Sequence, residues 1–210
     1  LGNDLDFTTD ARPDAIERLV KPLALTTWDV GRAFGTIGSL MREDDGREWV
    51  VEVTTYRADS YDPDSRKPTV EFGDNLRGDL VRRDFTVNAM ALSVTTGAFV
   101  DLFGGLDDLA DHVLRTPAAP EVSFSDDPLR MMRAARFSSQ LGFVTAPEVV
   151  AAMTGMAERI TIVSAERVRD ELTKLLLSDD PRPGLDLMVR TGLAELDEHD
   201  VIGLHIGQPL

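Results

Sequence analysis

The hydrophobic periodicity of this chain changes part-way along, and that change restricts the folds open to it more than any other feature. Up to about residue 115, two strand-like runs at 33–40 and 49–55 lie between helix-like stretches at 12–20 and 75–91. From about residue 123 every periodic segment is helical; the segments span 127–141, 147–160, 165–177 and 184–191. The pattern predicts an α+β head followed by an all-helical neck.

Turn-forming residues separate the predicted segments of the head. Asp45-Gly46 between the first two strand-like runs indicates a hairpin, and a Thr-Thr-Gly turn between 92–94 and 98–102 indicates a second one. A stretch rich in Asp, Pro and Ser at 59–68 is typical of a loop. Asp127 or Ser125 can cap the first neck helix, with Pro128 in its first turn and Gly142 as its stop.

The Thr-Pro-Ala-Ala-Pro run at 116–120 is the natural linker between the two parts. We assign residues 1–118 to the head, 119–196 to the neck, and 197–210 to an irregular tail or the start of a further domain. The last stretch has no clear helical or strand period, and the chain starts directly before an acidic motif. We therefore expect residues to be missing at one end or near Leu196.

Composition excludes several classes of protein. The chain contains no cysteine, which excludes disulfides and thiolate metal sites, and its three histidines are too scattered to form a zinc-binding pair. No run approaches the roughly 18 apolar residues of a membrane span, and the first residues lack a signal-peptide pattern. We expect a cytoplasmic protein without a membrane partner.

The net charge of −15 argues, taken alone, against a nucleic-acid partner. Neutralising phosphates supplies much of the affinity for RNA, so RNA-binding proteins usually carry a visible basic excess. A local cluster of arginines can still act inside an acidic chain.

Three carboxylates are candidates for metal chemistry. Asp4 and Asp6 alternate along a strand-like run, so they would share one face about 6–7 Å apart. Hard oxygen ligands of this kind hold Mg²⁺ in two-metal phosphoryl transfer. Glu52 lies among apolar strand residues, where a carboxylate is costly unless paired or bound to metal. Solvated surface charge and an edge strand explain the same residues equally simply.

The run Arg82-Arg83-Asp84-Phe85-Thr86-Val87-Asn88 places forked donors beside acceptors. Arginine forks suit triphosphate oxygens, and Asp84 with Asn88, one helical turn apart, can read ribose hydroxyls. A solvated amphipathic helix is the alternative interpretation.

A second cluster follows at Asp127-Pro128-Leu129-Arg130. Asp127 and Arg130, three residues apart, offer an acceptor and a bidentate donor that can read the edge of a base. Arg133 and Arg136 continue the basic character and suit phosphates. A capped helix with one surface ion pair is again the simpler alternative.

Taken together, these segments resemble the motifs of class II CCA-adding enzymes and bacterial poly(A) polymerases. The run from Arg82 to Ala91 is similar to the RRDFTxNAMA signature, and Asp126 to Arg130 resembles the EDxxR motif. Asp4-Leu5-Asp6 matches the DxD strand, Val51 to Arg57 the segment before a flexible loop, and Ser164 to Leu172 the SxERxxxEL motif. Five motifs in the right order over about 1–176 make a chance match improbable.

The resemblance implies a polymerase-β-like nucleotidyltransferase head before the helical neck, and an enzyme that adds CTP and ATP to the 3′ end of tRNA. It implies two Mg²⁺ ions on Asp4 and Asp6, with Glu52 as a less certain third carboxylate. It further implies that triphosphate and ribose are held by Arg82, Arg83, Asp84 and Asn88. Asp127 and Arg130 would select the base, Arg133 and Arg136 would serve phosphates, and the motif at 164–172 would brace the neck.

Two departures from the family pattern keep alternatives open. The family's Gly-rich turn belongs just before the DxD strand, where this sequence begins, so triphosphate cradling would be incomplete. Asp126 stands where the family has Glu, which keeps the charge. Poly(A) addition, CC-only or A-only addition, and a non-catalytic nucleotide- or RNA-binding module remain the competing hypotheses.

Overall fold

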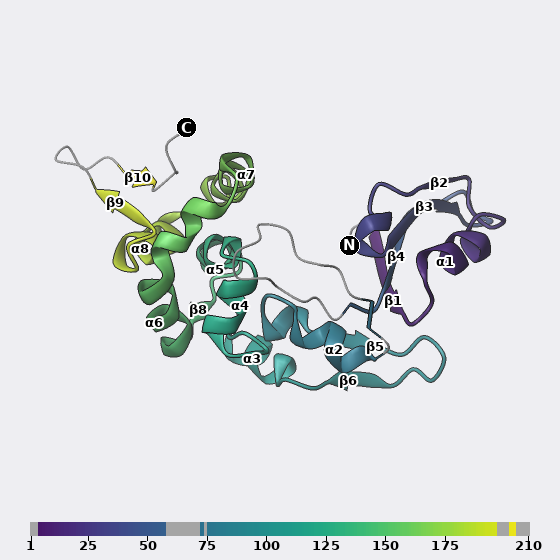
Figure 1. Cartoon of the computed structure of the whole chain (residues 1–210), viewed down its shortest axis with the longest axis horizontal. Coiled ribbons are helices and arrows are strands. Elements are labelled where there is room, and N and C mark those ends of the chain that lie inside the picture. Colours follow the sequence, from purple (N-terminus) through teal and green to yellow (C-terminus); the bar gives the residue numbers. More distant parts are fainter. Residues whose placement is uncertain (1–3, 58–71, 74, 197–201, 205–210) are drawn as a thin grey trace. The chain divides into compact units, whose positions relative to one another are not determined.

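The computed structural model describes residues 4–57, 72–73, 75–196 and 202–204 (Figure 1). The chain forms two compact units, residues 1–82 and 83–210. The predicted α+β class is confirmed: within the described residues, the first unit carries a four-stranded sheet and the second is mainly helical. The head and neck limits at 118 and 196 stay predictions.

The first unit is built around its sheet. Its elements are β1 (Asp4–Thr9), α1 (Pro13–Val20), β2 (Thr26–Trp28), the 3₁₀ helix η1 (Arg32–Phe34), β3 (Thr36–Arg42), β4 (Glu48–Thr55) and α2 (Leu76–Val81). The strand order is β1-β4-β3-β2, with β1 parallel to β4 and the other pairs antiparallel. The predicted hairpin joins β3 to β4, and Gly46 supplies its left-handed turn at φ 86°. The loop predicted at 59–68 lies outside the described residues.

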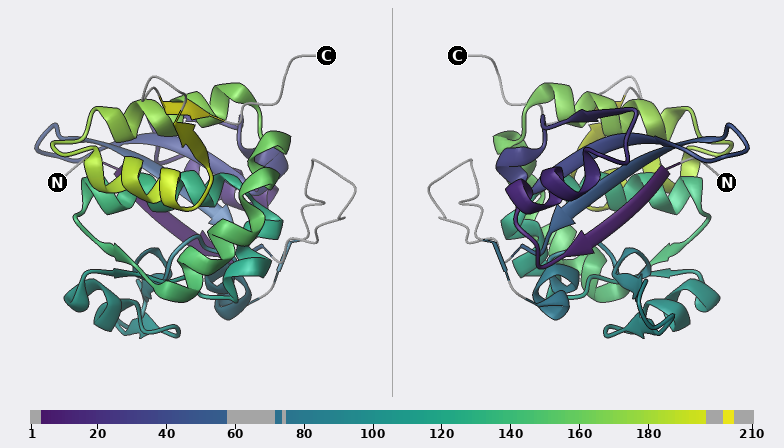
Figure 2. Two further views of the ribbon diagram at one scale, coloured as in Figure 1. Left: turned by 90° about the vertical axis from the view of Figure 1, so that its left-hand side faces the viewer. Right: turned by 90° about the vertical axis from the view of Figure 1, so that its right-hand side faces the viewer.

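Helix α1 covers one face of this sheet, as the two views in Figure 2 show. Ile16 and Val20 of the helix pack against Ile37 of β3, and Val53 of β4 borders the same cluster. Successive side chains of a strand point to opposite faces. Glu52, next to Val53, therefore points to the face that α1 leaves uncovered.

The second unit starts with short elements and continues with helices. Its elements are η2 (Thr86–Asn88), β5 (Met90–Leu92), β6 (Phe99–Asp101), α3 (Gly105–Asp111), β7 (Val113–Leu114), α4 (Pro120–Asp126), α5 (Leu129–Gln140), β8 (Val144–Thr145), α6 (Pro147–Met156), η3 (Ala157–Ile162), α7 (Ala165–Leu176), α8 (Arg182–Arg190), β9 (Ala194–Leu196) and β10 (Ile202–Leu204). The three short strand pairs are β5–β6, β7–β8 and β9–β10. The second predicted hairpin is confirmed by β5–β6.

Helix α5 lies at the centre of the second unit, where it packs against α4, α7 and α8. Its Met131, Met132, Ala134 and Ala135 are completely buried in the core. The helix ends as predicted, because Gly142 adopts a left-handed φ of 67° two residues beyond its end. The core therefore fixes the position of this helix, which carries charged residues of the predicted site.

The prediction of one helix over 75–91 was wrong. Helix α2 ends at Val81, Phe85 is extended, and the chain then passes through η2 into β5. Tertiary contacts prevail over the helical pattern here: the backbone N–H of Thr86 donates to Arg115 O at 2.8 Å, and Phe85 is completely buried. The β-branched Thr86 and Val87 also have low helix propensity.

Several further elements were not predicted. Helix α3 follows Gly104, which has a left-handed φ of 75°, and α4 begins at Pro120, inside the expected linker, where proline suits a first helical turn. The neck also carries strands β8 and β9, and residues 202–204 pair with β9 although no strand period was visible there.

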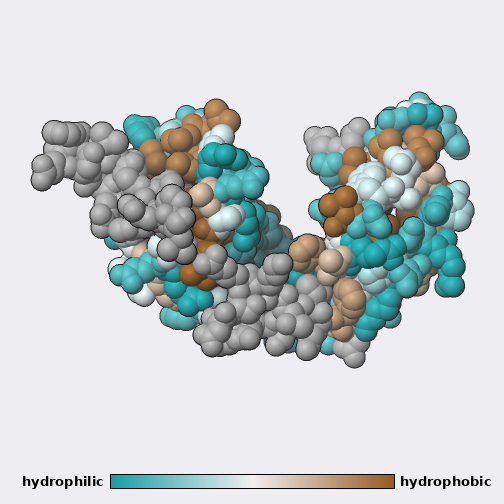
Figure 3. Space-filling model, turned by 45° about the horizontal axis from the view of Figure 1, so that its top comes forward, coloured by the Kyte–Doolittle hydropathy of each residue, from teal (hydrophilic) through white to brown (hydrophobic). Residues whose placement is uncertain are grey.

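The surface of both units shows scattered hydrophobic side chains, brown in Figure 3. Leu23, Val30, Val94, Val144 and Leu177 are among the most exposed. Single exposed residues of this kind are normal for folded proteins. No helix within the described ranges is long and apolar enough to span a membrane.

Candidate active site

The sheet of the first unit brings three of the predicted site carboxylates onto one face. Asp6 on β1 is the register partner of Glu52 on β4. Asp4 lies two residues before Asp6 on the same strand, so its side chain points to the same face. Asp4 and Asp6 are exposed and Glu52 is half-buried. No hydrogen bond or ion pair engages any of the three within the described part of the chain, so their oxygens are available to a ligand.

This donor set fits Mg²⁺ that is completed by a substrate. Magnesium is usually held by one or two carboxylates together with substrate phosphates and water, and Asp4 and Asp6 on one rigid strand supply that pair. Across 4–57, 72–73, 75–196 and 202–204, no three His, Asp or Glu side chains converge closely enough to enclose a metal. A closed structural metal site is therefore excluded among those residues, and Glu52 as a third ligand stays a prediction.

A buried carboxylate that sequence reasoning missed organises the ends of the strands. Asp79 on α2 is completely buried and accepts hydrogen bonds from the Thr8 hydroxyl at 3.3 Å and the Arg57 backbone N–H at 3.3 Å. It also pairs with Arg82 at 2.8 Å. Asp79 thus holds Arg82, a predicted triphosphate ligand, beside the end of β1. The spacing of Asp79 and Arg82, three residues apart in a helix, was the available signal.

Asp84 is the centre of a second cluster, in the second unit. It is 9% exposed and accepts hydrogen bonds from the Phe85 backbone N–H at 2.8 Å, from Asn88 Nδ2 at 3.1 Å, and from Arg133 Nε at 2.8 Å. Burial alone would raise the pKa of Asp84, but the Arg133 guanidinium and these hydrogen bonds lower it below its usual value. Asp84 is therefore held as a carboxylate.

The predicted proximity of Asp84 and Asn88 is thus present, although the expected helical turn is not. Asn88 lies at the end of η2 and is itself exposed. Its carbonyl oxygen and one N–H donor remain for a ligand, since Asp84 uses one donor.

Arg133 and Arg136 of α5 are both engaged by the buried Glu171 of α7. Arg136 Nε donates to Glu171 Oε2 at 2.6 Å, and Arg133 Nη1 lies 3.8 Å from Glu171 Oε1. The guanidinium of Arg136 also lies 4.1 Å from the ring centre of Phe137. Glu171 belongs to the segment expected to brace the neck. A role of these arginines toward phosphates stays a prediction, and it would use their remaining donors.

Asp127 and Arg130 are positioned by different neighbours. Asp127 accepts from the Leu129 backbone N–H at 3.1 Å, beside the start of α5, and from Arg167 Nη2 at 2.8 Å. The N-cap of α5 is Pro128 and no side chain makes a cap hydrogen bond there, so the prediction of Asp127 or Ser125 as the cap was wrong. Arg130 is 9% exposed and donates to Ser123 Oγ at 2.8 Å. The expected bracing motif at 164–172 therefore supplies both Arg167, which holds Asp127, and Glu171.

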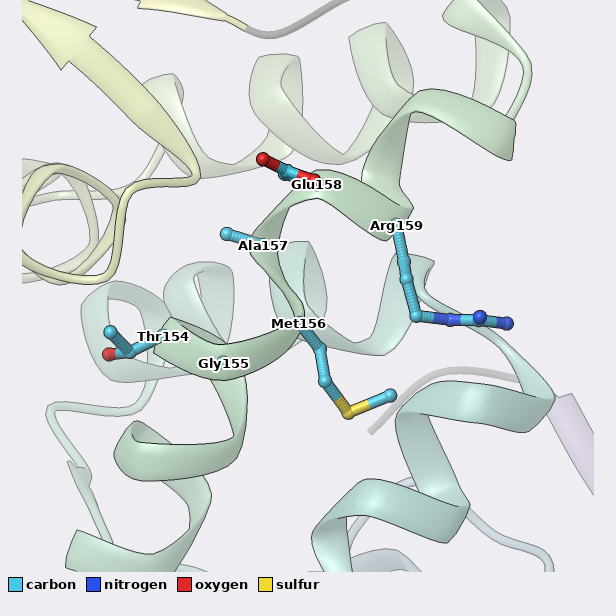
Figure 4. Close-up of a pocket in the computed structure, with 6 residues that line it drawn as sticks. All are labelled: Thr154, Gly155, Met156, Ala157, Glu158 and Arg159. Atoms are coloured by element: carbon cyan, nitrogen blue, oxygen red, sulfur yellow. The ribbon is translucent and has the colours of Figure 1, made fainter.

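One surface hollow lies at the junction of α6 and η3 (Figure 4). It is lined by Thr154, Gly155, Met156, Ala157, Glu158 and Arg159. Figure 4 shows these side chains pointing in different directions, so they do not converge on a ligand. None of the predicted site residues lines it.

Similarity to known proteins agrees with this arrangement. The sequence profile described as "Poly A polymerase head domain" matches residues 2–115, more than half of the chain. This chain belongs to the poly(A) polymerase head-domain family. A second profile, "Probable RNA and SrmB- binding site of polymerase A", matches residues 142–196, which include α6, α7 and α8.

Its relatives in this family include CCA-adding enzymes. The CCA-adding enzyme of Levilactobacillus brevis is 43% identical over 192 residues, 91% of this chain and 46% of that protein. The crystal structure of the Bacillus stearothermophilus CCA-adding enzyme in complex with CTP superposes with a TM-score of 0.76 at 36% identity, over 90% of this chain and 44% of that one. A tRNA nucleotidyltransferase complexed with a primer tRNA and an incoming ATP analog gives a TM-score of 0.68 at 28% identity, over 91% and 53%. The chain spans about half the length of the curated relatives it matches.

Proposed function

We propose that this chain is the catalytic part of a template-independent tRNA nucleotidyltransferase that adds C and A to the tRNA 3′ end. The observation that carries the proposal is a pair of exposed aspartates, Asp4 and Asp6, on one strand of a chain of this family, which no other residue in the described ranges engages. Its relatives with this activity, one of them in complex with CTP, support the choice of reaction. Because the proposed substrate is tRNA, we also expect the protein to act in the cytoplasm.

In the reaction, the RNA 3′-hydroxyl loses its proton to solvent and its oxygen forms a bond to the α-phosphorus of the nucleotide. The bond from the α-phosphorus to the oxygen that bridges it to the β-phosphorus breaks, and pyrophosphate leaves. Two bound Mg²⁺ ions would stabilise the attacking and leaving oxygens. Asp4 and Asp6 would hold the ions, and their shared strand keeps the two carboxylates at a fixed spacing. Glu52 adds negative charge beside Asp6, which favours cation binding at this face.

Nucleotide choice would fall to the second unit. Asp127 offers an acceptor and Arg130 a set of donors, and the contacts with Arg167 and Ser123 limit how far either can turn. Fixed polar groups discriminate strongly between ligands, because a wrong base leaves buried donors unpaired. Asp84 and Asn88 would bind the ribose, and Arg82, Arg83, Arg133 and Arg136 would serve the phosphates.

An incorporation assay tests the proposal. The whole chain is given CTP, ATP, GTP or UTP separately with Mg²⁺, on tRNA transcripts that end before, within and after the CCA sequence. We expect CTP to extend the shortest transcript, ATP to extend the one ending in CC, and the complete tRNA to stay unchanged.

Matched variants test the metal assignment in the same assay. Asp4→Ala with Asp6→Ala should abolish pyrophosphate release, whereas Asp44→Ala with Asp45→Ala, the same charge change in the exposed β3–β4 turn, should preserve it. Persistent release in the first variant would refute the metal assignment.

The other hypotheses give different products. Addition of ATP alone to arbitrary RNA indicates a poly(A) polymerase, and a single nucleotide type on tRNA indicates a CC-only or A-only enzyme. No pyrophosphate release from the unchanged chain indicates a non-catalytic binding module.

A further inference from the structure

A tryptophan lies in the same cross-sheet row as the predicted metal ligands. Gly38 on β3 is the register partner of Glu52 on β4 and of Trp28 on β2, and Glu52 pairs in turn with Asp6 on β1. Residues paired across a sheet point to the same face. Asp6, Glu52, Gly38 and Trp28 therefore form one row on the face that α1 leaves uncovered.

The indole of Trp28 lies directly over the backbone of Gly38. A Cβ atom at Gly38 would lie 2.0 Å from the indole Nε1, 2.2 Å from Cε2 and 2.7 Å from Cζ2. Only glycine fits beneath the ring in this position. The glycine thus lets the ring move inward from β2 to a place beside Glu52.

An aromatic ring over a strand glycine can serve packing alone. The hydrophobic core of this unit, however, lies on the opposite face, around Ile16, Val20 and Ile37. Trp28 is partly exposed, and the neighbouring members of its row, Glu52 and Asp6, are carboxylates without a partner among the described residues. The ring therefore borders a polar face that is open to a ligand.

Strand spacing indicates what the ligand is. Neighbouring strands lie about 4.8 Å apart, so a ring above β3 is about 10 Å from β1. Stacked bases rise by about 3.4 Å each, so an RNA whose 3′-hydroxyl reaches Asp4 and Asp6 has a base two or three positions upstream near the ring. We propose that Trp28 stacks on the third or fourth nucleobase from the 3′ end of the RNA substrate. The proposal rests on the proposed function.

Stacking suits both the reaction and the charge of this face. The RNA end changes with each added nucleotide, and stacking tolerates any base because every base has a π face. It also needs no positive charge, which this row of carboxylates does not provide.

Tryptophan fluorescence tests the contact directly. The chain has two tryptophans, so Trp49→Phe leaves Trp28 as the only indole emitter. Titration with a short single-stranded RNA that ends in cytidine should quench Trp28 emission, while CTP with Mg²⁺ alone should not. Fluorescence anisotropy of the labelled RNA measures binding independently.

Three substitutions separate stacking from folding. Trp28→Ala should raise the Kd for this RNA and the KM for tRNA by about 5- to 150-fold, the range for losing one base–aromatic stack, and leave the KM for CTP unchanged. Trp28→Phe should restore most of the affinity. Gly38→Ala keeps the tryptophan but displaces it, and should weaken RNA binding as Trp28→Ala does. Gly155→Ala, which meets no atom within 4 Å, is the matched glycine control.

RNA that binds by anisotropy without quenching Trp28 would overturn the proposal, and so would the absence of RNA binding. Equal quenching by CTP alone would assign the ring to the incoming nucleotide and reject an RNA contact. Failure of the proposed function can be distinguished from failure of the Trp28 contact. In that case the unchanged chain would release no pyrophosphate, whatever the fluorescence shows.

Discussion

Replacing Glu171 by glutamine should destabilise the helical unit strongly, because it leaves the Arg136 guanidinium without its counter-charge. The side chain of Glu171 is 5% exposed and that of Arg136 is 11% exposed, so neither group can turn into water without moving α5 or α7. Arg133 loses less electrostatic stabilisation, because its side chain is 32% exposed and keeps its ion pair with Asp84. Glutamine preserves the shape and the acceptor while removing the charge.

The expected cost follows from this burial. Removing one partner of a buried ion pair costs about 3–5 kcal/mol. Because a neutral acceptor remains and Arg133 keeps Asp84, we take the low end, about 3 kcal/mol. For a chain of this size that corresponds to a fall in Tm of about 6–12 °C.

Thermal and urea unfolding followed by far-UV circular dichroism, which reports mainly on the helices, measure this loss. Asp186→Asn is the matched control: its pair with Arg190 is 65% and 59% exposed, so we expect about 0–1 kcal/mol. Adding Arg136→Met to Glu171→Gln should recover part of the loss, because the stranded charge is then gone. A Glu171→Gln variant as stable as the control would refute the reasoning.

Three other changes should give results of defined sign. Asp84→Asn should destabilise the chain at pH 7 in urea unfolding. Folding lowers the pKa of Asp84, so the stabilisation by its carboxylate is complete above the pKa of the unfolded chain, about 3.9, and is lost as pH falls through the pKa of the folded chain. The difference in stability between the two proteins should therefore shrink below about pH 4. Gly184→Ala places a Cβ 2.3 Å from a carbonyl oxygen of α5 and should cost about 1–3 kcal/mol in thermal unfolding, whereas Gly155→Ala, with open space around it, should stabilise by up to about 1 kcal/mol. Arg167→Ala releases Asp127 and should reduce the ratio of CTP to UTP incorporation by about tenfold in competition assays, with little loss of Tm because Arg167 is 54% exposed.

Local patterns predicted the elements whose own residues decide their structure. The β3–β4 hairpin follows from Asp45-Gly46, and the end of α5 follows from Gly142, because turn and stop residues act within a few positions of the chain. The four predicted neck helices were found for the same reason, since each carries its own apolar period.

The segment after α2 shows why the rest was not predictable. Phe85 and Thr86 carry a helical pattern, yet Phe85 enters the core and Thr86 pairs with the distant Arg115. Neither contact can be predicted from the residues next to it in the sequence. Asp79 and Glu171 illustrate the same limit in the site. The spacing of Asp79 and Arg82 indicated an ion pair, but not the contacts of Asp79 with Thr8 and Arg57. Glu171 was expected only as part of a bracing segment, and its pairs with Arg133 and Arg136 were not predicted.

These internal pairs also change how the net charge of −15 bears on function. Arg133 and Arg136 pair with Asp84 and Glu171, which offset part of their positive charge. Asp4, Asp6 and Glu52 place three carboxylates on the face of the sheet that α1 leaves uncovered. In the proposed reaction, cations held by these carboxylates would offset part of the charge of the substrate phosphates, alongside the arginines. An acidic sheet face is consistent with the proposed reaction, so the net charge of −15 does not by itself argue against an RNA partner.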